Sequence, residues 1–375
     1  MRANADILVL GAGVVGCTVA WELASRHGAK VTVLERAVPG AEASSAAAGI
    51  LGAQIESHDA PPPGPGPRRA LFDLLIASRE RHRLLDAQLL DRVGVSTGFR
   101  ACGAMRVTRD PRRLQALVAG HLWQREHDQR VTTLDAKEAH ALEPALAEEI
   151  VGGVHLADDA QLDPPSLLRA LQLACVDAGV VFESGATVRG VVQTAGRISG
   201  VRVEGGEIQA PIVIVCAGSW SSMIDGLPLA ARAVRPVRGQ IVQVDTRPPI
   251  VKRIVFGDAG YLLSRADGRT LLGSTMEEAG HVKEVTVGGI HAVLGYAIAT
   301  VPGIASAPIT ATWSGFRPAT QRDTPIIGAT KIGGLFIATG HFRNGILLAA
   351  ETARLVADLV ATGRCDRDLS PFAID

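Results

Sequence analysis

The segment DILVLGAGVVGCTVAWELASRHGAKVTVLER, residues 6–36, constrains the fold more than any other part of the chain. An apolar run, a glycine-rich turn, a helical pattern and a second apolar run predict a β-strand, a helix and a parallel β-strand. Gly11, Gly13 and Gly16 give the G-x-G-x-x-G spacing, and Glu35 ends the second run. Because small residues let the backbone approach a pyrophosphate and an acid at this position binds ribose hydroxyls, the unit predicts dinucleotide binding. The acid also argues against the 2′-phosphate of NADP.

The stretch SSAAAGILGAQIE, residues 44–56, follows this unit and bears on the identity of the cofactor. Its small residues would let the backbone lie against a flat ring system, while Ser44 or Ser45 reaches a phosphate. The alternative is that the stretch is a flexible alanine-rich linker. Composition leaves the choice between NAD and FAD open.

The charge and hydropathy of the chain favour a small-molecule partner. Lys plus Arg equals Asp plus Glu at 38 each, so no net field attracts nucleic acid or an anionic membrane. The apolar run beginning at residue 7 leaves no room for a leader peptide, and no apolar stretch reaches the roughly 18 residues of a membrane span. We therefore expect a cytoplasmic protein. The 5 cysteines are scattered and never in C-x-x-C spacing, so we expect buried thiols and no metal site.

The pattern of the remaining elements predicts an α/β fold. APPPGPGPRR, residues 60–69, reads as a surface loop before a helix from residue 70 to about 92, and Asp163-Pro164 begins another helix that ends at Gly179. Short strands with turn signals between residues 234 and 275 indicate an antiparallel sheet, while a buried strand and a helix close the chain. We expect a Rossmann-like cofactor domain with an inserted substrate domain that is mainly antiparallel sheet plus helices. The approximate limits are 1–85, 150–225 and 322–375 for the first, and 86–149 and 226–321 for the second.

Several motifs together carry a resemblance to a known family. They are the 11–16 turn with Glu35, SSAAAGIL, VCAGSWS, GYLLSR followed by LLGSTM, WSGFRPAT and GHFRNGILLA, in this order along the chain. The sequence resembles the D-amino-acid oxidase and sarcosine oxidase (DAO) family of FAD-dependent oxidoreductases, and within it the glycine oxidases of thiamine biosynthesis. The resemblance implies an isoalloxazine ring in front of the helix that begins in GHFRNGILLA. That helix end would stabilise negative charge on the N1–C2=O edge of reduced flavin.

The resemblance also implies which residues bind the cofactor. Some relatives attach flavin covalently through a cysteine or histidine. The segments SSAAAG, residues 44–49, and FRPATQRDTPIIG, residues 316–328, contain neither, so non-covalent FAD is expected. The expected cofactor-binding residues are Gly11, Gly13, Val14, Val15, Gly16, Glu35, Arg36, Ser44, Ser45, Ala47, Ala48, Gly49, Val188, Ala217, Gly218, Trp220, His341, Arg343, Asn344, Gly345 and Ile346.

The substrate site is likewise expected from the resemblance. Arg317 is expected to pair with the substrate carboxylate, Tyr261 to add a hydrogen bond, and Arg343 to lie nearer the mouth; Met276, Gly49 and Ile50 would line the pocket. An arginine fork matches two carboxylate oxygens. Taken alone, Arg317 could be a solvated charge, Tyr261 a core aromatic and Met276 core packing. No side-chain base is expected, and His341 is assigned no catalytic role.

The implied reaction is oxidative deamination of glycine or a similarly small amino acid such as sarcosine or D-alanine. A hydride passes from Cα to flavin N5, and the products are the 2-oxo acid, ammonia or an amine, and hydrogen peroxide. The glycine imine could supply thiazole synthesis. The residues at 258–260, before Tyr261, are small or acidic and leave substrate size open. Two alternatives remain: an oxidase or dehydrogenase of larger D-amino acids or D-proline-like imino acids, and a catalytically silent flavin-binding subunit. The expected partners are substrate and oxygen, with a homotetramer and a thiazole synthase partner implied by the family.

Overall fold

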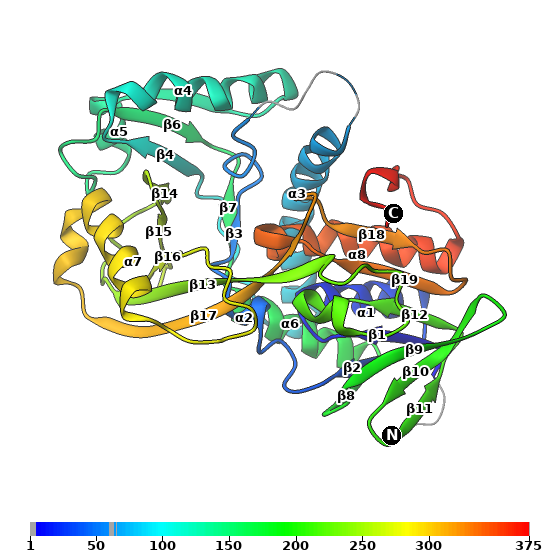
Figure 1. The fold of residues 1–375 in the computed structure, drawn as a ribbon. Helices are drawn as coiled ribbons and strands as arrows, with labels where there is room; N and C mark the ends of the chain where they lie inside the picture. Colours follow the sequence, from blue (N-terminus) through cyan, green and yellow to red (C-terminus); the bar gives the residue numbers. More distant parts are fainter. Residues whose placement is uncertain (1–4, 60–63, 65, 375) are drawn as a thin grey trace.

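The computed structural model describes residues 5–59, 64 and 66–374, and its first three elements form the expected unit (Figure 1). Strand β1 (Ile7–Leu10) leads into helix α1 (Val14–His27), and β2 (Val31–Glu35) pairs with β1 in parallel. Helix α1 ends at Gly28, which adopts φ 63° and donates its N–H to the Ala24 carbonyl. The positive φ suits a residue without Cβ. The predicted strand, helix and strand are thus confirmed.

A mostly parallel sheet forms around β1. Its strand order is β18-β19-β12-β1-β2-β8, with only β18 antiparallel to its neighbour. The other strands are β8 (Val181–Ser184), β12 (Ile212–Val215), β18 (Ile326–Ala329) and β19 (Leu335–Thr339). The buried strand expected near the end of the chain is β19, which pairs with β12 and so joins one sheet with β1.

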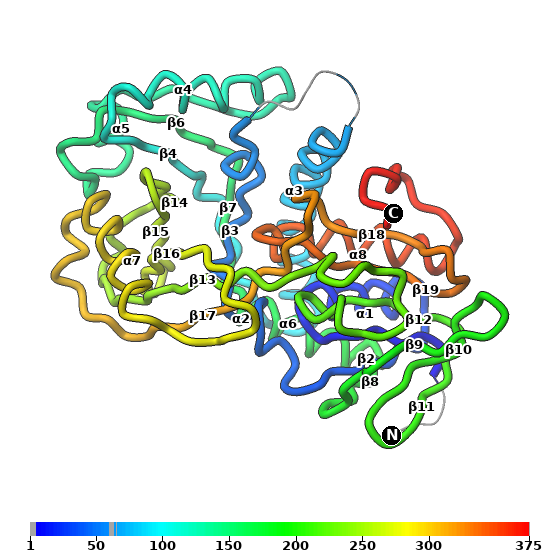
Figure 2. Tube along the Cα trace, in the orientation of Figure 1, coloured from blue at the N-terminus to red at the C-terminus, as the bar shows by residue number. Residues whose placement is uncertain are grey.

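Both faces of this sheet are covered by other elements. Successive side chains of each strand point to opposite faces, so each strand contributes to two cores. Ile7 and Val9 pack on the helical side, whereas Leu8 and Leu10 pack on the other. The helical layer contains α1, α3 (Pro67–Val93), α6 (Pro164–Asp177) and α8 (Gly345–Thr362). The opposite layer is a three-stranded sheet of β9 (Val188–Thr194), β10 (Arg197–Val203) and β11 (Gly206–Gln209). Figure 2 shows the last helix of the chain lying beside the first.

A second sheet of eight strands has the order β17-β13-β16-β15-β14-β4-β6-β5. The strands predicted between residues 234 and 275 are all present in it, and their antiparallel pairing is confirmed. Its members are β4 (Ala104–Thr108), β5 (Val131–Asp135), β6 (Gly152–Leu156), β13 (Val234–Asp245), β14 (Ile254–Phe256), β15 (Tyr261–Ser264), β16 (Arg269–Gly273) and β17 (Ile309–Thr320). Helices α5 (Ala136–Leu142) and α7 (Val287–Thr300) pack on one face of this sheet. Helix α4 (Pro111–Leu122) contacts strands β4, β5 and β6.

Some boundaries differ from the sequence-based expectation. Helix α3 begins at Pro67, three residues before the expected start at Ala70, because proline is well tolerated in the first helical turn. Residues 60–63 and 65 of the expected surface loop lie outside the described part of the chain. Strand β6 belongs to the eight-stranded sheet, although residue 150 was taken as a return to the cofactor domain. The domain division stays a prediction.

Two further observations concern the whole described chain. Among residues 5–59, 64 and 66–374, no helix is both long and apolar enough to cross a membrane, and no group of three or more His, Cys, Asp or Glu side chains could hold a metal ion. All five cysteines are free thiols, and Cys17, Cys175 and Cys216 are buried.

Candidate active site

A cavity of about 420 Å³ extends from the turn between β1 and α1 to the face of the eight-stranded sheet. Its walls come from short helix α2 (Ala43–Ala46), the 3₁₀ helix η2 (Gly218–Met223), strand β17 and the start of α8. These segments are distant in the sequence, and the two sheets bring them together. The cavity therefore lies where the predicted cofactor and substrate sites would meet.

The glycine turn at one end of the cavity leaves no space for side chains. A Cβ on Gly16 would lie 1.9 Å from the Gly11 carbonyl oxygen, and Gly11 itself adopts φ 101°. The helix thus packs directly on the turn, and the backbone of Gly11 and Gly13 faces the cavity. Such a turn at a helix N-terminus is a ready site for a pyrophosphate.

Glu35 and Ser44 hold this turn in place. The Glu35 carboxylate accepts hydrogen bonds from the amides of Ala12 at 2.9 Å and Ala37 at 3.0 Å. The Ser44 hydroxyl accepts one from the amide of Val14 at 2.9 Å. Both side chains line the cavity as well, so each can face a ligand while it orders the backbone.

An arginine and an aromatic ring form another part of the wall. The Arg36 guanidinium carbon lies 3.7 Å from the centre of the Trp220 ring, which is stacked on His281 at 4.9 Å between centroids. Glu42 fixes Arg36 through an ion pair of 2.7 Å. Glu42 also lines the cavity and was not predicted from the sequence.

The start of α8 contributes His341, Asn344, Gly345 and Ile346 to the cavity wall. Burial lowers the pKa of His341 to about 4, and its Nε2 lies 3.2 Å from the Thr352 hydroxyl. The imidazole is therefore neutral and already has a structural partner. That His341 has no catalytic role stays a prediction.

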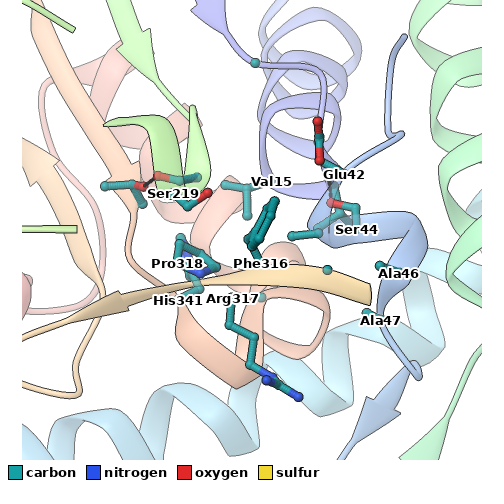
Figure 3. Close-up of a pocket in the computed structure, with 18 of the residues that line it drawn as sticks. Val15, Glu42, Ser44, Ala46, Ala47, Ser219, Phe316, Arg317, Pro318 and His341 are labelled. Carbon is teal, nitrogen blue, oxygen red and sulfur yellow. Dashed lines mark hydrogen bonds between the residues drawn. The ribbon is translucent and has the colours of Figure 1, made fainter. Parts of the chain in front are cut away.

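Arg317 occupies the part of the cavity beneath strand β17. Figure 3 shows Phe316 and Arg317 extending from this strand in opposite directions. The Arg317 guanidinium donates to the Thr275 carbonyl at 3.1 Å and to the Ser274 hydroxyl at 2.5 Å. Burial lowers its pKa, but an arginine that stays charged in a buried place can still bind an anion.

Tyr261 lies in the same part of the cavity, on strand β15. A Cβ on Gly273, its partner across the sheet, would lie 2.2 Å from the tyrosine ring, so the ring lies flat over this glycine. Burial raises the pKa of Tyr261, while nearby Arg317 and Ser274 act in the opposite direction. The hydroxyl therefore stays protonated and can donate a hydrogen bond.

Arg343 pairs with an acid from a distant segment. Its Nε lies 3.0 Å from a carboxylate oxygen of Glu56, and its side chain is 40% exposed, whereas that of Glu56 is 17% exposed. Both residues line the cavity. Arg343 thus stands at the more exposed side of the cavity, as expected for a residue near the mouth.

Most of the residues expected at the site line this one cavity. They are Gly11, Gly13, Val14, Val15, Glu35, Arg36, Ser44, Ala47, Ala48, Gly49, Ile50, Val188, Ala217, Gly218, Trp220, Tyr261, Arg317, His341, Arg343, Asn344, Gly345 and Ile346. Their individual roles stay a prediction.

Three expected residues do not line it. Gly16 lies behind the turn, where it provides close packing, and the Ser45 hydroxyl instead donates to the Glu42 carbonyl. Met276 is 59% exposed, so the expected role in lining the pocket is corrected to a surface position. It follows β16 after the chain has left the sheet, and the apolar character of Met276 suggested burial.

Sequence reasoning missed several residues that line the cavity, among them Glu56, Ser274, Phe256 and Phe316. Glu56 is the last residue of the stretch 44–56, which was expected to lie against the cofactor, so its place in the sequence already indicated a position near the site. Ser274 lies within the quoted motif LLGSTM, but its contact with Arg317 depends on the pairing of β13 with both β16 and β17, which no local pattern shows.

Gly239 offers a direct test of the position of Arg317. A Cβ on Gly239 would lie 2.3 Å from the Arg317 guanidinium, which is the movable end of a flexible side chain. Gly239→Ala should therefore displace the guanidinium and leave the sheet intact, with a loss of catalytic efficiency of about tenfold to a hundredfold. Steady-state kinetics and thermal unfolding would measure this. The same substitution at exposed Gly288, where a Cβ meets nothing within 4 Å, is the control, and equal kinetics in the two variants would contradict the placement.

The fold and the cavity define a class: an enzyme that binds a dinucleotide at the carboxyl ends of parallel strands and brings it to a substrate site on a second sheet. Comparisons with known proteins agree, since residues 6–359 match the family model DAO, FAD dependent oxidoreductase. The chain therefore belongs to this DAO family of FAD-dependent oxidoreductases.

Individual relatives cover nearly the whole chain. Glycine oxidase of Geobacillus kaustophilus is 32% identical over 100% of this chain and 97% of its own, and its crystal structure superposes with a TM-score of 0.93 over 99% of that chain. The bifunctional protein ThiO/ThiG of Trichormus variabilis is 34% identical over 98% of this chain and 54% of its own length. Hydrogen cyanide synthase subunit HcnC of Pseudomonas aeruginosa is 30% identical over 99% of this chain and 96% of its own. The chain thus spans about half the length of the bifunctional relative.

The residues of the cavity fit FAD. The turn at Gly11, Gly13 and Gly16 has no side chain to obstruct a pyrophosphate, and a Cβ on Gly13 would already lie 3.2 Å from the Ser44 hydroxyl. The Glu35 carboxylate stands at the end of β2, where it can accept from ribose hydroxyls. The start of α8 then lines the same cavity through Gly345 and Ile346.

Proposed function

We propose that the protein oxidatively deaminates glycine or a similarly small amino acid, such as sarcosine or D-alanine. The observation that carries the proposal is the placement of Arg317 and Tyr261 together, in a cavity that also contains the glycine turn and the start of α8. Glycine oxidase of Geobacillus kaustophilus, similar over the whole chain, supports the choice of substrate class.

Arg317 would bind the substrate carboxylate through its two-pronged guanidinium, and the Tyr261 hydroxyl would donate a further hydrogen bond to it. The amine binds neutral, and no side chain has to remove a proton from Cα. His341 is bonded to Thr352 and Glu56 is paired with Arg343, so neither is placed as a free base. When bound, FAD supplies the acceptor for the hydride that leaves Cα.

The balance of the overall reaction involves oxygen and water. The amino acid loses a hydride from Cα and a proton from nitrogen, water hydrolyses the resulting imine to the 2-oxo acid and ammonia, and oxygen is reduced to hydrogen peroxide. What the chain contributes is orientation, with Cα held about 3 to 3.5 Å from the accepting atom.

The cellular setting is part of the proposal. We place the enzyme in the cytoplasm as a homotetramer, and we infer that its imine product can be passed to a thiazole synthase in thiamine biosynthesis. The bifunctional relative ThiO/ThiG supports this link, because 46% of its length lies beyond the 54% matched here and could supply a second activity.

The attachment of the flavin gives a further prediction. The protein should purify yellow, and acid or heat precipitation should release the colour into the supernatant, because the family's attachment motifs contain no cysteine or histidine in this chain. Absorbance of pellet and supernatant would measure it. Colour that stays in the pellet would show a covalent bond.

The function itself is tested by a peroxide-coupled assay that compares glycine, sarcosine, D-alanine and D-proline. Fastest turnover of glycine or sarcosine supports the proposal, and preference for D-proline would support an oxidase of imino acids. Flavin that no amino acid reduces would favour a catalytically silent flavin-binding subunit. The similarity to a relative named as a subunit, HcnC, is the reason to test this alternative.

A further inference from the structure

Helix α3 places a serine hydroxyl inside the hydrogen-bond ladder of α8. Ser78, fully buried on α3, donates to the Leu347 carbonyl at 2.6 Å and accepts from the Glu351 amide at 3.0 Å. Leu347 and Glu351 are positions i and i+4 of α8, whose carbonyl and amide would ordinarily bond to each other. A side chain inserted at this point fixes the local geometry of the helix.

One turn along α3, His82 contacts the same part of α8. Its Nε2 lies 2.8 Å from the Ile346 carbonyl oxygen and 3.0 Å from that of Leu347, and the residue is 1% exposed. Burial lowers the pKa of His82 to about 4, so the ring is neutral and carries one N–H. Two carbonyls face Nε2, whereas Nδ1 has no partner within the described residues, so the proton is on Nε2.

These bonds act at Ile346, which lines the cavity, and at Leu347, the residue that follows it. Helix α8 begins at Gly345, so the amide of Leu347 belongs to its first turn, where amides have no carbonyl partner within the helix. The Ile346 carbonyl and the Leu347 amide are two ends of one peptide unit. A donor on the carbonyl makes the amide more positive, because hydrogen bonds in a chain polarise one another.

Simple packing would not require these groups. The other buried side chains of α3 include Phe72, Leu74, Leu75, Leu85 and Leu89, which show that the helix can be held by apolar contacts. A histidine with one unpartnered nitrogen costs stability in a buried place. Its two contacts with α8 carbonyls are what offset this cost.

We propose that Ser78 and His82 are positioning residues that orient and polarise the first turn of α8, and so set how strongly this helix end stabilises the reduced flavin. The inference rests on the proposed function and on the position that the family resemblance implies for the flavin ring, in front of α8. Stabilisation of an anion by a helix end falls off within the first turn, which is where both residues act.

The test measures the electron affinity of the flavin rather than turnover. Sulfite adds to oxidised flavin and leaves negative charge on the N1–C2=O edge, so its dissociation constant reports the stabilisation of that charge. For holoenzyme His82→Leu and Ser78→Ala we expect sulfite binding about fivefold weaker, from the usual strength of a helix end. The midpoint potential should fall correspondingly, by about 20 mV for a two-electron couple. His82→Gln, which keeps an N–H donor, should restore part of the affinity.

Arg81→Gln is the matched control. Arg81 also joins α3 to α8, through a 2.8 Å ion pair with Glu351, but it makes no contact with the first-turn carbonyls. It should change thermal stability without changing sulfite binding. If the His82→Leu variant does not fold, the sulfite affinity and midpoint potential of Ser78→Ala alone test the inference.

Sulfite affinity and potential that stay within twofold of the parent in a yellow, folded Ser78→Ala or His82→Leu protein would overturn the inference and leave the proposed function intact. So would an equal effect of Arg81→Gln. A parent protein that binds no FAD would instead overturn the proposed function itself.

Discussion

Replacing Arg317 by leucine is expected to lower kcat/KM for glycine by several hundred-fold or more. The substrate carboxylate would then be buried without a charged partner, which costs about 3 to 5 kcal/mol. Ser274 and the Thr275 carbonyl, the present partners of the guanidinium, cannot replace it, because neither carries a positive charge. Anaerobic flavin reduction by glycine measures the loss, and FAD content should stay normal.

Two comparisons isolate the effect of the charge in this variant. Arg317→Lys should recover only part of the loss, because an ammonium cannot reproduce the two-pronged geometry. An uncharged amine of similar size should lose far less than glycine in Arg317→Leu. Equal losses on both substrates would show that the carboxylate is bound elsewhere, and Arg343, 3.0 Å from Glu56, would be the first residue to test.

Replacing Glu35 by alanine is the second change with a large expected effect. Two charge-assisted hydrogen bonds to the ribose, each worth about 1.5 to 3 kcal/mol, would be lost, so FAD should bind at least about a hundredfold more weakly. The structure adds a second cause, since the amides of Ala12 and Ala37 would lose their acceptor and the turn would loosen. Titration of the apoprotein with FAD measures the dissociation constant.

Glu42→Ala is the control for this change, because Glu42 is another carboxylate at the cavity wall and its carboxylate pairs with Arg36 and Lys283 instead of with the amides of the glycine turn. We expect it to weaken FAD binding much less. Unchanged FAD affinity in Glu35→Ala would mean that the ribose is held by other residues.

The parts of the fold that could be predicted are those governed by local patterns. Strand β1, helix α1 and strand β2 follow from an apolar run, a glycine turn and a second apolar run that are contiguous in the chain. The four strands β13 to β16 were visible because turn residues separate short apolar runs. The parallel pairing of β14 with β4, across about 150 residues of chain, left no local trace, so no local pattern showed that β6 joins the eight-stranded sheet.

The residues of the candidate site also fall into two groups, those that a local pattern identifies and those whose contacts depend on distant parts of the chain. Gly11, Gly13 and Glu35 could be identified from spacing alone, whereas Arg317 and Tyr261 stood out only through the family resemblance. The pairing of Glu56 with Arg343 and the contacts of Ser78 and His82 with α8 depend on how distant helices and loops pack, and no sequence period reports that. Met276 was misplaced because an apolar residue after a strand is usually buried.

The central claim is that this cavity joins a bound FAD to a small amino acid held by Arg317. The most direct measurement is the absorbance of the flavin in the purified holoenzyme, mixed without oxygen with glycine and then exposed to air. We expect glycine to bleach the flavin and oxygen to restore its colour with formation of hydrogen peroxide. A flavin that stays oxidised with glycine, sarcosine and D-alanine alike would contradict the claim.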